Sequence, residues 1–143
     1  MKRAFVYIMG ILTRPRQGFT LILFDAQSLS VSFLLLLASA VAWATAVFGL
    51  ALAALEPWAT PWLVIPSSEY YYWEALFALP VILTGWMLAS GFAQLMSHRV
   101  GGGGSFEATA KLLALSIAIS SLVHVIPALA LAFFALGGAL DAA

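Results

Sequence analysis

The chain has 143 residues, of which 64% are apolar and only 8% are charged. Soluble domains are about 45–50% apolar and about 25% charged, so this composition excludes a soluble globular protein and predicts a membrane protein. The six basic and six acidic residues leave no net charge, and there is no cysteine. Composition therefore gives no reason to expect a nucleic-acid partner, and it excludes disulfides, thiolate metal sites and cysteine nucleophiles.

Residues 1–28 are predicted to lie on the cytoplasmic face of the membrane rather than across it. Apolar residues at helical spacing occur on both sides of a break at 14–16, and neither stretch reaches the ~20 residues that a span needs. Basic residues flank both stretches, which favours an interfacial amphipathic helix region in the headgroup layer over a soluble arm packed on the spans. No small-x-small cleavage site follows the first stretch, so we expect the N terminus to be retained.

Residues 29–143 are predicted to form a three-helix transmembrane domain, with spans at about 29–55, 74–96 and 112–136. The first span has no charge over 27 residues. As a helix it would be about 40 Å long, which exceeds the ~30 Å thickness of the hydrocarbon core, so we expect the helix to be tilted in the membrane. The overall prediction is an all-α membrane protein with three transmembrane helices after the interfacial N-terminal region.

The two loops between these spans differ in composition. The first, residues 56–73, is broken by prolines and rich in aromatic residues, which are typical of a belt at the headgroup level; a stacking platform for sugars or bases is the alternative. The second, residues 101–104, is four glycines, with Ser105 positioned to cap the next helix. No GK[ST] follows the glycines, so we expect a hinge rather than a phosphate loop.

The third span carries the most distinctive polar pattern. Ser116, Ser120 and His124 recur at i+4 and are followed at the same spacing by Ala128 and Ala132. We expect this stripe to face the interior of the bundle, as a candidate intramembrane polar face.

His124 is the one ionisable residue away from the ends of the three predicted spans, where Glu74 marks the start of the second, so its chemistry is considered separately. A catalytic serine–histidine pair lacks an acid within the spans, and a haem or metal site lacks a second ligand. A histidine hydrogen-bonded between helices, a proton relay and a pigment ligand remain as interpretations. No catalytic, cofactor-binding or metal site is predicted.

All basic residues can be placed on one side of the membrane. None lies in the first loop or the C-terminal tail. The residues that precede the first span are Lys2, Arg3, Arg14 and Arg16, and those that flank the second loop are Arg99 and Lys111. The positive-inside rule therefore predicts a cytoplasmic N terminus and an external C terminus, as three spans also require. These six residues are the candidate contacts for lipid headgroups or partners.

Two segments carry distinctive text: residues 13–19 (TRPRQGF) and residues 103–109 (GGSFEAT), the latter overlapping the G-x-G-S-F pattern at 102–106. They resemble the bacterial branch of the Yip family, the Ypt/Rab-interacting membrane proteins. The resemblance implies a helical multi-pass fold in the bacterial inner membrane, with a cytosolic N terminus and no catalytic residues. It also implies five spans where this chain has three, so we expect a shortened member, a piece of a longer protein, or a bundle completed by partner helices.

The sequence thus predicts a non-enzymatic integral membrane protein that acts by helix packing and by protein or lipid interaction, without a cofactor. Its expected partners are membrane lipid and other transmembrane helices, in a homo-oligomer or a larger complex, and no nucleic acid. An accessory subunit of a membrane transport or energy-converting complex is the alternative function, and a membrane enzyme comes third.

Overall fold

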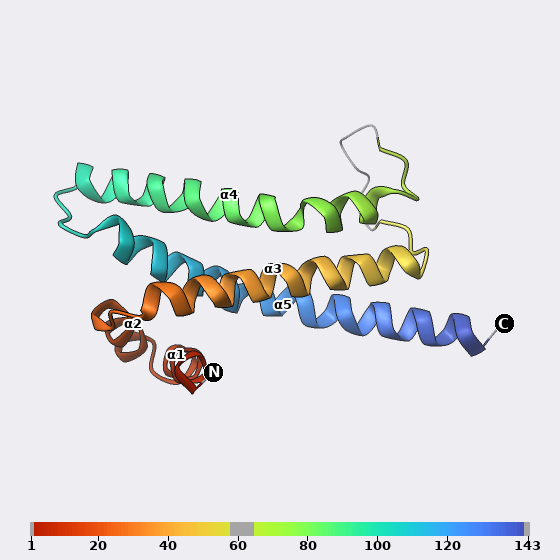
Figure 1. Ribbon diagram of the computed structural model, residues 1–143, viewed down its shortest axis with the longest axis horizontal. Coiled ribbons are helices and arrows are strands. Elements are labelled where there is room, and N and C mark those ends of the chain that lie inside the picture. The colour runs from red at the N-terminus through yellow and green to blue at the C-terminus, as the bar shows by residue number, and fades with distance from the viewer. Residues whose placement is uncertain (1, 58–64, 142–143) are drawn as a thin grey trace. The chain divides into compact units, whose positions relative to one another are not determined.

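The computed structural model describes the backbone of residues 2–57 and 65–141, and the side chains of residues 3–57 and 65–137. The side chain of Lys2 and the loop residues Trp58 and Trp62 therefore lie outside the described part. Within it the fold is all-α, as predicted, and five helices follow one another without a strand (Figure 1). They are α1 (Lys2–Thr13), α2 (Pro15–Phe24), α3 (Ser28–Leu52), α4 (Tyr70–Arg99) and α5 (Phe106–Asp141).

Three of these helices are long and apolar enough to cross a membrane, which confirms the predicted three-span fold class. The candidate spans are Ser28–Leu52, Tyr70–Arg99 and Phe106–Gly137. The N-terminal region forms two short helices, α1 and α2, which fits the predicted amphipathic segment. Pro15 is the first residue of α2, where its fixed φ favours helix initiation, and it disfavours helical geometry at the preceding Arg14.

The helix ends differ from the predicted span limits in ways that local chemistry explains. Helix α4 begins at Tyr70, four residues before the predicted limit at Glu74, so residues 70–73 form its first turn rather than the loop. Helix α3 ends at Leu52, where the amide of Leu55 donates to the carbonyl of Leu50 and Ala54 takes a left-handed φ of 52°. Such a six-to-one bond with a left-handed residue is the Schellman helix stop, in which glycine is the usual residue.

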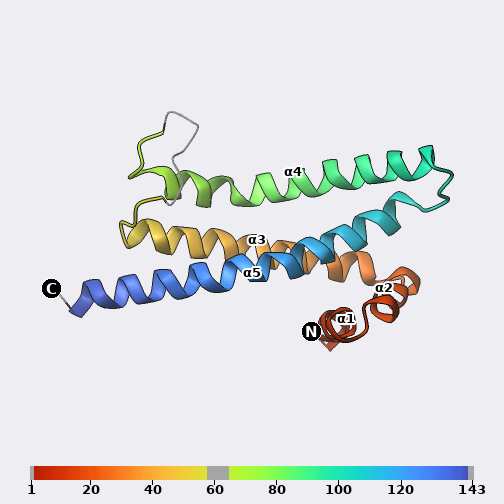
Figure 2. The ribbon, with the colours of Figure 1, turned by 180° about the vertical axis from the view of Figure 1, so that it is seen from behind.

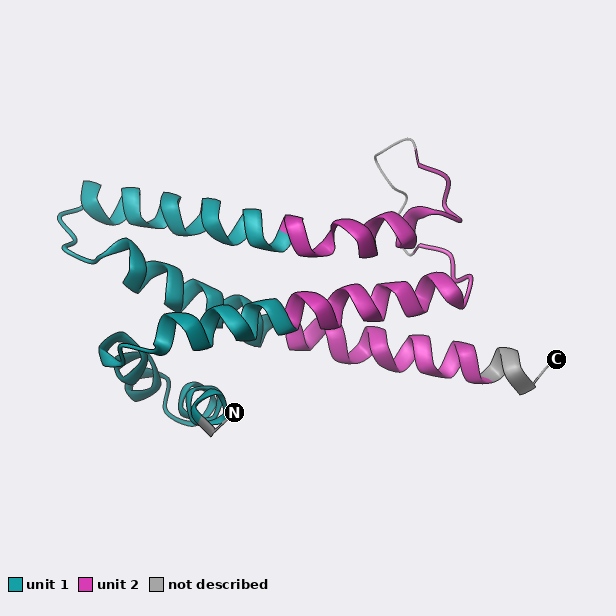
Figure 3. Ribbon diagram, viewed as in Figure 1, with its two compact units in different colours: residues 1–38, 82–120 teal, residues 39–81, 121–143 magenta. Residues whose placement is uncertain are grey.

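The chain divides into two compact units (Figure 3). Unit 1 contains residues 1–38 and 82–120, and unit 2 contains residues 39–81 and 121–143. Because the three long helices each run through both units, every unit contains one part of α3, one of α4 and one of α5.

Unit 1 contains the N-terminal helical hairpin, α1 and α2, beside the beginning of α3 in two opposite views (Figures 1 and 2). The hairpin is tight: a Cβ atom on Gly18 would lie only 2.7 Å from the backbone of Gly10 and Ile11. Its core joins α1, α2 and α5 through three fully buried side chains, Tyr7, Ile22 and Leu115. Partly buried residues of α3, Val31 and Leu35, pack against them. The amphipathic hairpin is therefore an integral part of unit 1.

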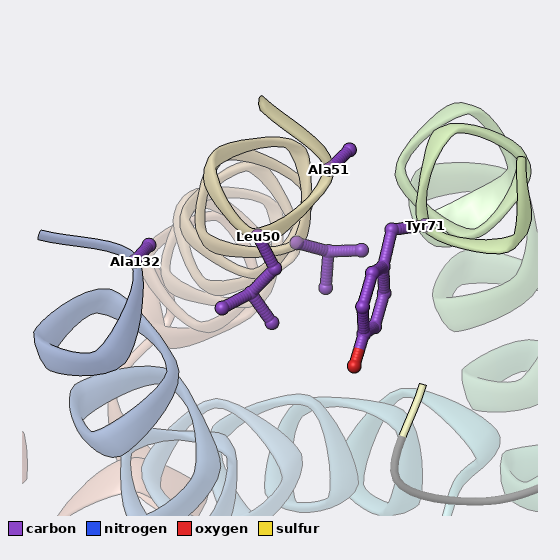
Figure 4. Close-up of a cluster of buried hydrophobic side chains, with 5 residues drawn as sticks. Leu50, Ala51, Tyr71 and Ala132 are labelled. Carbon is purple, nitrogen blue, oxygen red and sulfur yellow. The ribbon is translucent and has the colours of Figure 1, made fainter. Parts of the chain in front are cut away.

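Unit 2 has an apolar core of its own, to which α3, α4 and α5 contribute side chains (Figure 4). Val47, Leu50 and Ala51 of α3 pack with Tyr71 of α4 and Ala132 of α5. A Cβ atom on Gly49 would lie 2.9 Å from the Cβ atom of Ala132, so glycine allows α3 and α5 to approach closely here.

Candidate functional site

A cluster of charged and polar side chains in unit 1 consists of Arg3, Tyr7, Asp25 and Lys111. We call it the polar cluster. Asp25 follows α2, and its carboxylate accepts hydrogen bonds from the Tyr7 hydroxyl at 2.5 Å and from the Gln27 amide at 2.9 Å. The guanidinium of Arg3 lies 3.4 Å from the same carboxylate. Asp25 thereby ties α1 to the α2–α3 connection.

Lys111 of α5 reaches the same region from the interior. It is only 5% exposed, and its Nζ donates to the carbonyl oxygen of Leu23, in the last turn of α2, at 3.0 Å. Glu107 lies one turn before it, with 4.0 Å between Nζ and Oε1, but that carboxylate is exposed. A cation at the C-terminal end of a helix is favourable, because the last carbonyl groups carry partial negative charge. Lys111 therefore stabilises the docking of α2 on α5.

The electrostatics of the polar cluster follow from these bonds. The hydrogen bond from Tyr7 and the one from the Gln27 amide lower the pKa of Asp25 below its usual 3.8, and the charges of Arg3 and Lys111 act in the same direction. Burial, and then the hydrogen bond to Asp25, raise the pKa of Tyr7 to about 12. Asp25 is therefore ionised and Tyr7 neutral across the physiological range, so the polar cluster is suited to holding helices together rather than to proton transfer.

The remaining predicted basic contacts are exposed. Arg14 and Arg16 flank the start of α2, and Arg99 ends α4. Lys111 departs from the prediction, because its ammonium group is buried against Leu23 and is not available at the surface. Arg3 is exposed but paired with Asp25. Of the described basic side chains, Arg14, Arg16 and Arg99 are thus the ones presented outward without such a contact.

The predicted stripe on α5 does not form one inward face. Ser116 is half-buried, whereas Ser120 and His124 are exposed and Ala128 and Ala132 are buried. The reason is helix geometry: each i+4 step rotates by about 40°, so four steps move about 160° around the helix. The stripe is half-buried at Ser116, faces outward at Ser120 and His124, and is buried at Ala128 and Ala132. His124 is therefore not held between the described helices, and the Ser120 hydroxyl donates to the nearby carbonyl of Ile117 at 3.1 Å.

Sequence reasoning missed one acidic group within the spans. Because α4 begins at Tyr70, Glu74 lies one turn inside the helix, which corrects the expectation that no acid lies within a span. Its carboxylate is half-buried and accepts a hydrogen bond from Trp43 of α3 in unit 2. Residues 70–73 contain no proline or glycine, so the sequence allows the helix to begin before Glu74, and this signal could have placed Glu74 inside it.

A second missed group stabilises the turn between α4 and α5. The side-chain nitrogen of Gln94 donates a hydrogen bond to the carbonyl of Gly104 and lies 2.9 Å from a ring nitrogen of His98. Its side-chain oxygen accepts a hydrogen bond from the Thr109 hydroxyl at 2.8 Å. In addition, the indole of Trp86 donates to the carbonyl of Ala110 at 2.8 Å. These bonds fix the second loop to both helices, so it is not an independent hinge.

In the described part of the chain, no three histidine, cysteine or acidic side chains lie close enough to hold a metal ion. No known protein family, curated protein or solved structure matches the chain. The polar cluster and the exposed arginines beside it are therefore interpreted from their own geometry.

Proposed function

We propose that this chain is a non-enzymatic, Yip-like integral membrane protein that presents its N-terminal helical hairpin at the cytoplasmic surface of the bacterial inner membrane. There the hairpin contacts lipid or a protein partner. The observation that carries the proposal is the way in which the polar cluster fixes an amphipathic hairpin to the start of two spans. Such an arrangement positions a surface, whereas a catalytic site needs a free acid, base or nucleophile.

The exposed side of the hairpin supports a membrane location. Phe5, Leu12 and Phe24 are 65%, 63% and 85% exposed, although each is a large apolar side chain. Exposed apolar side chains beside arginines are typical of helices that lie in the headgroup layer. The positive-inside distribution of charge supports the cytoplasmic orientation.

The second candidate function is that of an accessory subunit in a larger membrane complex. The span within α4 favours it, because only 11% of its most apolar window is buried, against 33% for α3 and 22% for α5. A Cβ atom on Gly85 or Gly91 would meet nothing within 4 Å, so close packing of another helix is sterically open there.

Purification of the whole chain in a mild detergent, followed by native mass spectrometry, distinguishes the two functions. The Yip-like proposal predicts a monomer or homo-oligomer with bound phospholipid. A different membrane protein present at fixed stoichiometry would support the accessory role instead. If the purified chain converted a substrate to a product, and heating the chain abolished this activity, the non-enzymatic proposal would be contradicted.

A further inference from the structure

A shallow groove on the outer side of α2 is not explained by the packing of the hairpin. It has a volume of about 680 Å³ and is lined by Arg16, Gln17, Thr20, Leu21, Phe24 and Asp25. The residues of α2 that are buried in unit 1, Gly18 and Ile22, lie on the other side of the helix. The groove is therefore free while α2 stays docked.

The lining changes in character along the helix. Arg16 and Gln17 lie at its N-terminal end, Leu21 lies about one turn further on, and Phe24 about two turns. Leu21 is 48% exposed and Phe24 is 85% exposed. A ligand that matches this lining has an anionic head and an apolar body.

The charge of the groove favours an anion. Asp25 is the one acid in the lining, and it already binds Tyr7, Gln27 and Arg3. Arg16 is exposed and forms no ion pair within the described part of the chain. The uncompensated charge of the groove is thus the guanidinium of Arg16, and arginine matches the paired oxygens of a phosphodiester well.

We propose that the α2 groove binds an anionic phospholipid, with its phosphodiester at Arg16 and Gln17 and an acyl chain along Leu21 and Phe24. The site deepens the proposed function and rests on it, since it requires that the hairpin lie at a membrane surface. An inorganic phosphate ion would leave the apolar half of the groove in water, which is why the lipid is the favoured ligand.

The test is a lipid titration of the full-length chain in detergent, followed by native mass spectrometry. Phosphatidylglycerol is the anionic probe, and phosphatidylcholine is the zwitterionic one. The variant Arg16→Gln removes the charge in the groove. Arg99→Gln is the matched control, because it removes an exposed arginine outside the groove. Circular dichroism confirms that each variant keeps its helix content.

We expect Arg16→Gln to weaken phosphatidylglycerol binding about fivefold, which corresponds to the loss of one basic contact, and Arg99→Gln, a headgroup contact outside the groove, to weaken it clearly less. Phe24→Ser should weaken the binding of phosphatidylglycerol without affecting helix content. Equal effects of Arg16→Gln and Arg99→Gln, or equal affinity of the native chain for both lipids, would overturn the proposal. Competition by millimolar inorganic phosphate would also overturn it, because the site would then hold a small ion.

The lipid titration does not depend on which side of the membrane the hairpin occupies. A failure of this test would leave the location of the hairpin intact, whereas an inverted topology would refute the proposed function but not the affinity of the groove.

Discussion

The ammonium group of Lys111 lies 3.0 Å from the carbonyl oxygen of Leu23, although the two residues are 88 positions apart in the chain. This bond joins the last turn of α2 to the second turn of α5, inside unit 1. It connects the hairpin, which carries most of the exposed basic surface, to a helix long enough to span the membrane.

Replacing Lys111 should loosen the hairpin. Lys111→Ala leaves the carbonyl of Leu23 without its donor and opens space beside Leu115, so we expect a loss of about 1–3 kcal/mol in unfolding free energy. Hydrogen exchange measured by mass spectrometry in detergent should become faster in α1 and α2. Glu107→Gln is the control, because that exposed partner at 4.0 Å contributes little. Unchanged exchange in the hairpin of Lys111→Ala would show that the apolar core holds it alone.

The stability of unit 1 should depend on pH through the polar cluster. Because folding lowers the pKa of Asp25, its contribution is present above about pH 4 and is lost as the pH falls through the lower, folded-state value. Folding raises the pKa of Tyr7 to about 12, so its contribution is complete below pH 10 and is lost as the pH rises through 12.

Tyr7→Phe tests both limbs of this dependence. The variant should lose the alkaline step and show a smaller acid step, because the hydroxyl that lowers the pKa of Asp25 is gone. Thermal unfolding followed by circular dichroism between pH 3 and pH 12 provides the measurement. If the profile of the variant coincides with that of the native chain, the hydrogen bond between Tyr7 and Asp25 does not contribute to stability.

The glycines of the second loop should differ in their tolerance of alanine. A Cβ atom on Gly102 would lie 2.2 Å from the Ser97 hydroxyl and 2.9 Å from its carbonyl oxygen, whereas one on Gly103 would meet nothing within 4 Å. We expect Gly102→Ala to destabilise the chain by about 1–3 kcal/mol, through overpacking at the end of α4. Gly103→Ala is the matched control and should change the melting temperature little. Equal melting temperatures for the two variants would contradict this account.

The end of α3 offers a stabilising substitution. Ala54 has a φ of 52°, the left-handed conformation that costs an L-residue roughly 1–2 kcal/mol and that glycine adopts freely. Ala54→Gly should therefore raise the unfolding free energy by about 0.5–1 kcal/mol, since part of the gain is offset by the greater chain entropy of glycine. Ala53→Gly, at the adjacent position without a positive φ, should not stabilise. A lower melting temperature for Ala54→Gly would indicate that the helix ends elsewhere.

The number and order of the spans could be predicted from the sequence, because long uncharged stretches have few other uses in a folded chain. The start of α4 could not be predicted in this way, because the charge of Glu74 suggests a membrane boundary, whereas residues 70–73 continue the helix. The α5 stripe was expected to face inward along its whole length, but side-chain positions four residues apart are rotated by about 40° around the helix axis. That error placed His124 inside when its side chain is exposed.

The polar cluster lay beyond sequence reasoning for a different reason. Lys111 looked like one of six flanking cations, and nothing near it in the chain indicates that its partner is a backbone carbonyl of α2. In the same way, the four glycines predicted a loop, but only the fold shows that Ser97 leaves no room for a side chain at Gly102. Contacts between residues far apart in the sequence have to be read from the fold.

We propose that the hairpin and the α4–α5 turn lie together on the cytoplasmic side of the membrane. The chain has no cysteine, so single cysteines can be introduced as Thr13→Cys in the hairpin region, Ser68→Cys before α4, and Gly103→Cys in the second loop. Intact bacterial cells producing each variant are treated with a membrane-impermeant maleimide, before and after permeabilisation. We expect labelling of Ser68→Cys in intact cells, and of Thr13→Cys and Gly103→Cys only after permeabilisation. Labelling of Thr13→Cys in intact cells, or opposite behaviour of Thr13→Cys and Gly103→Cys, would contradict the account.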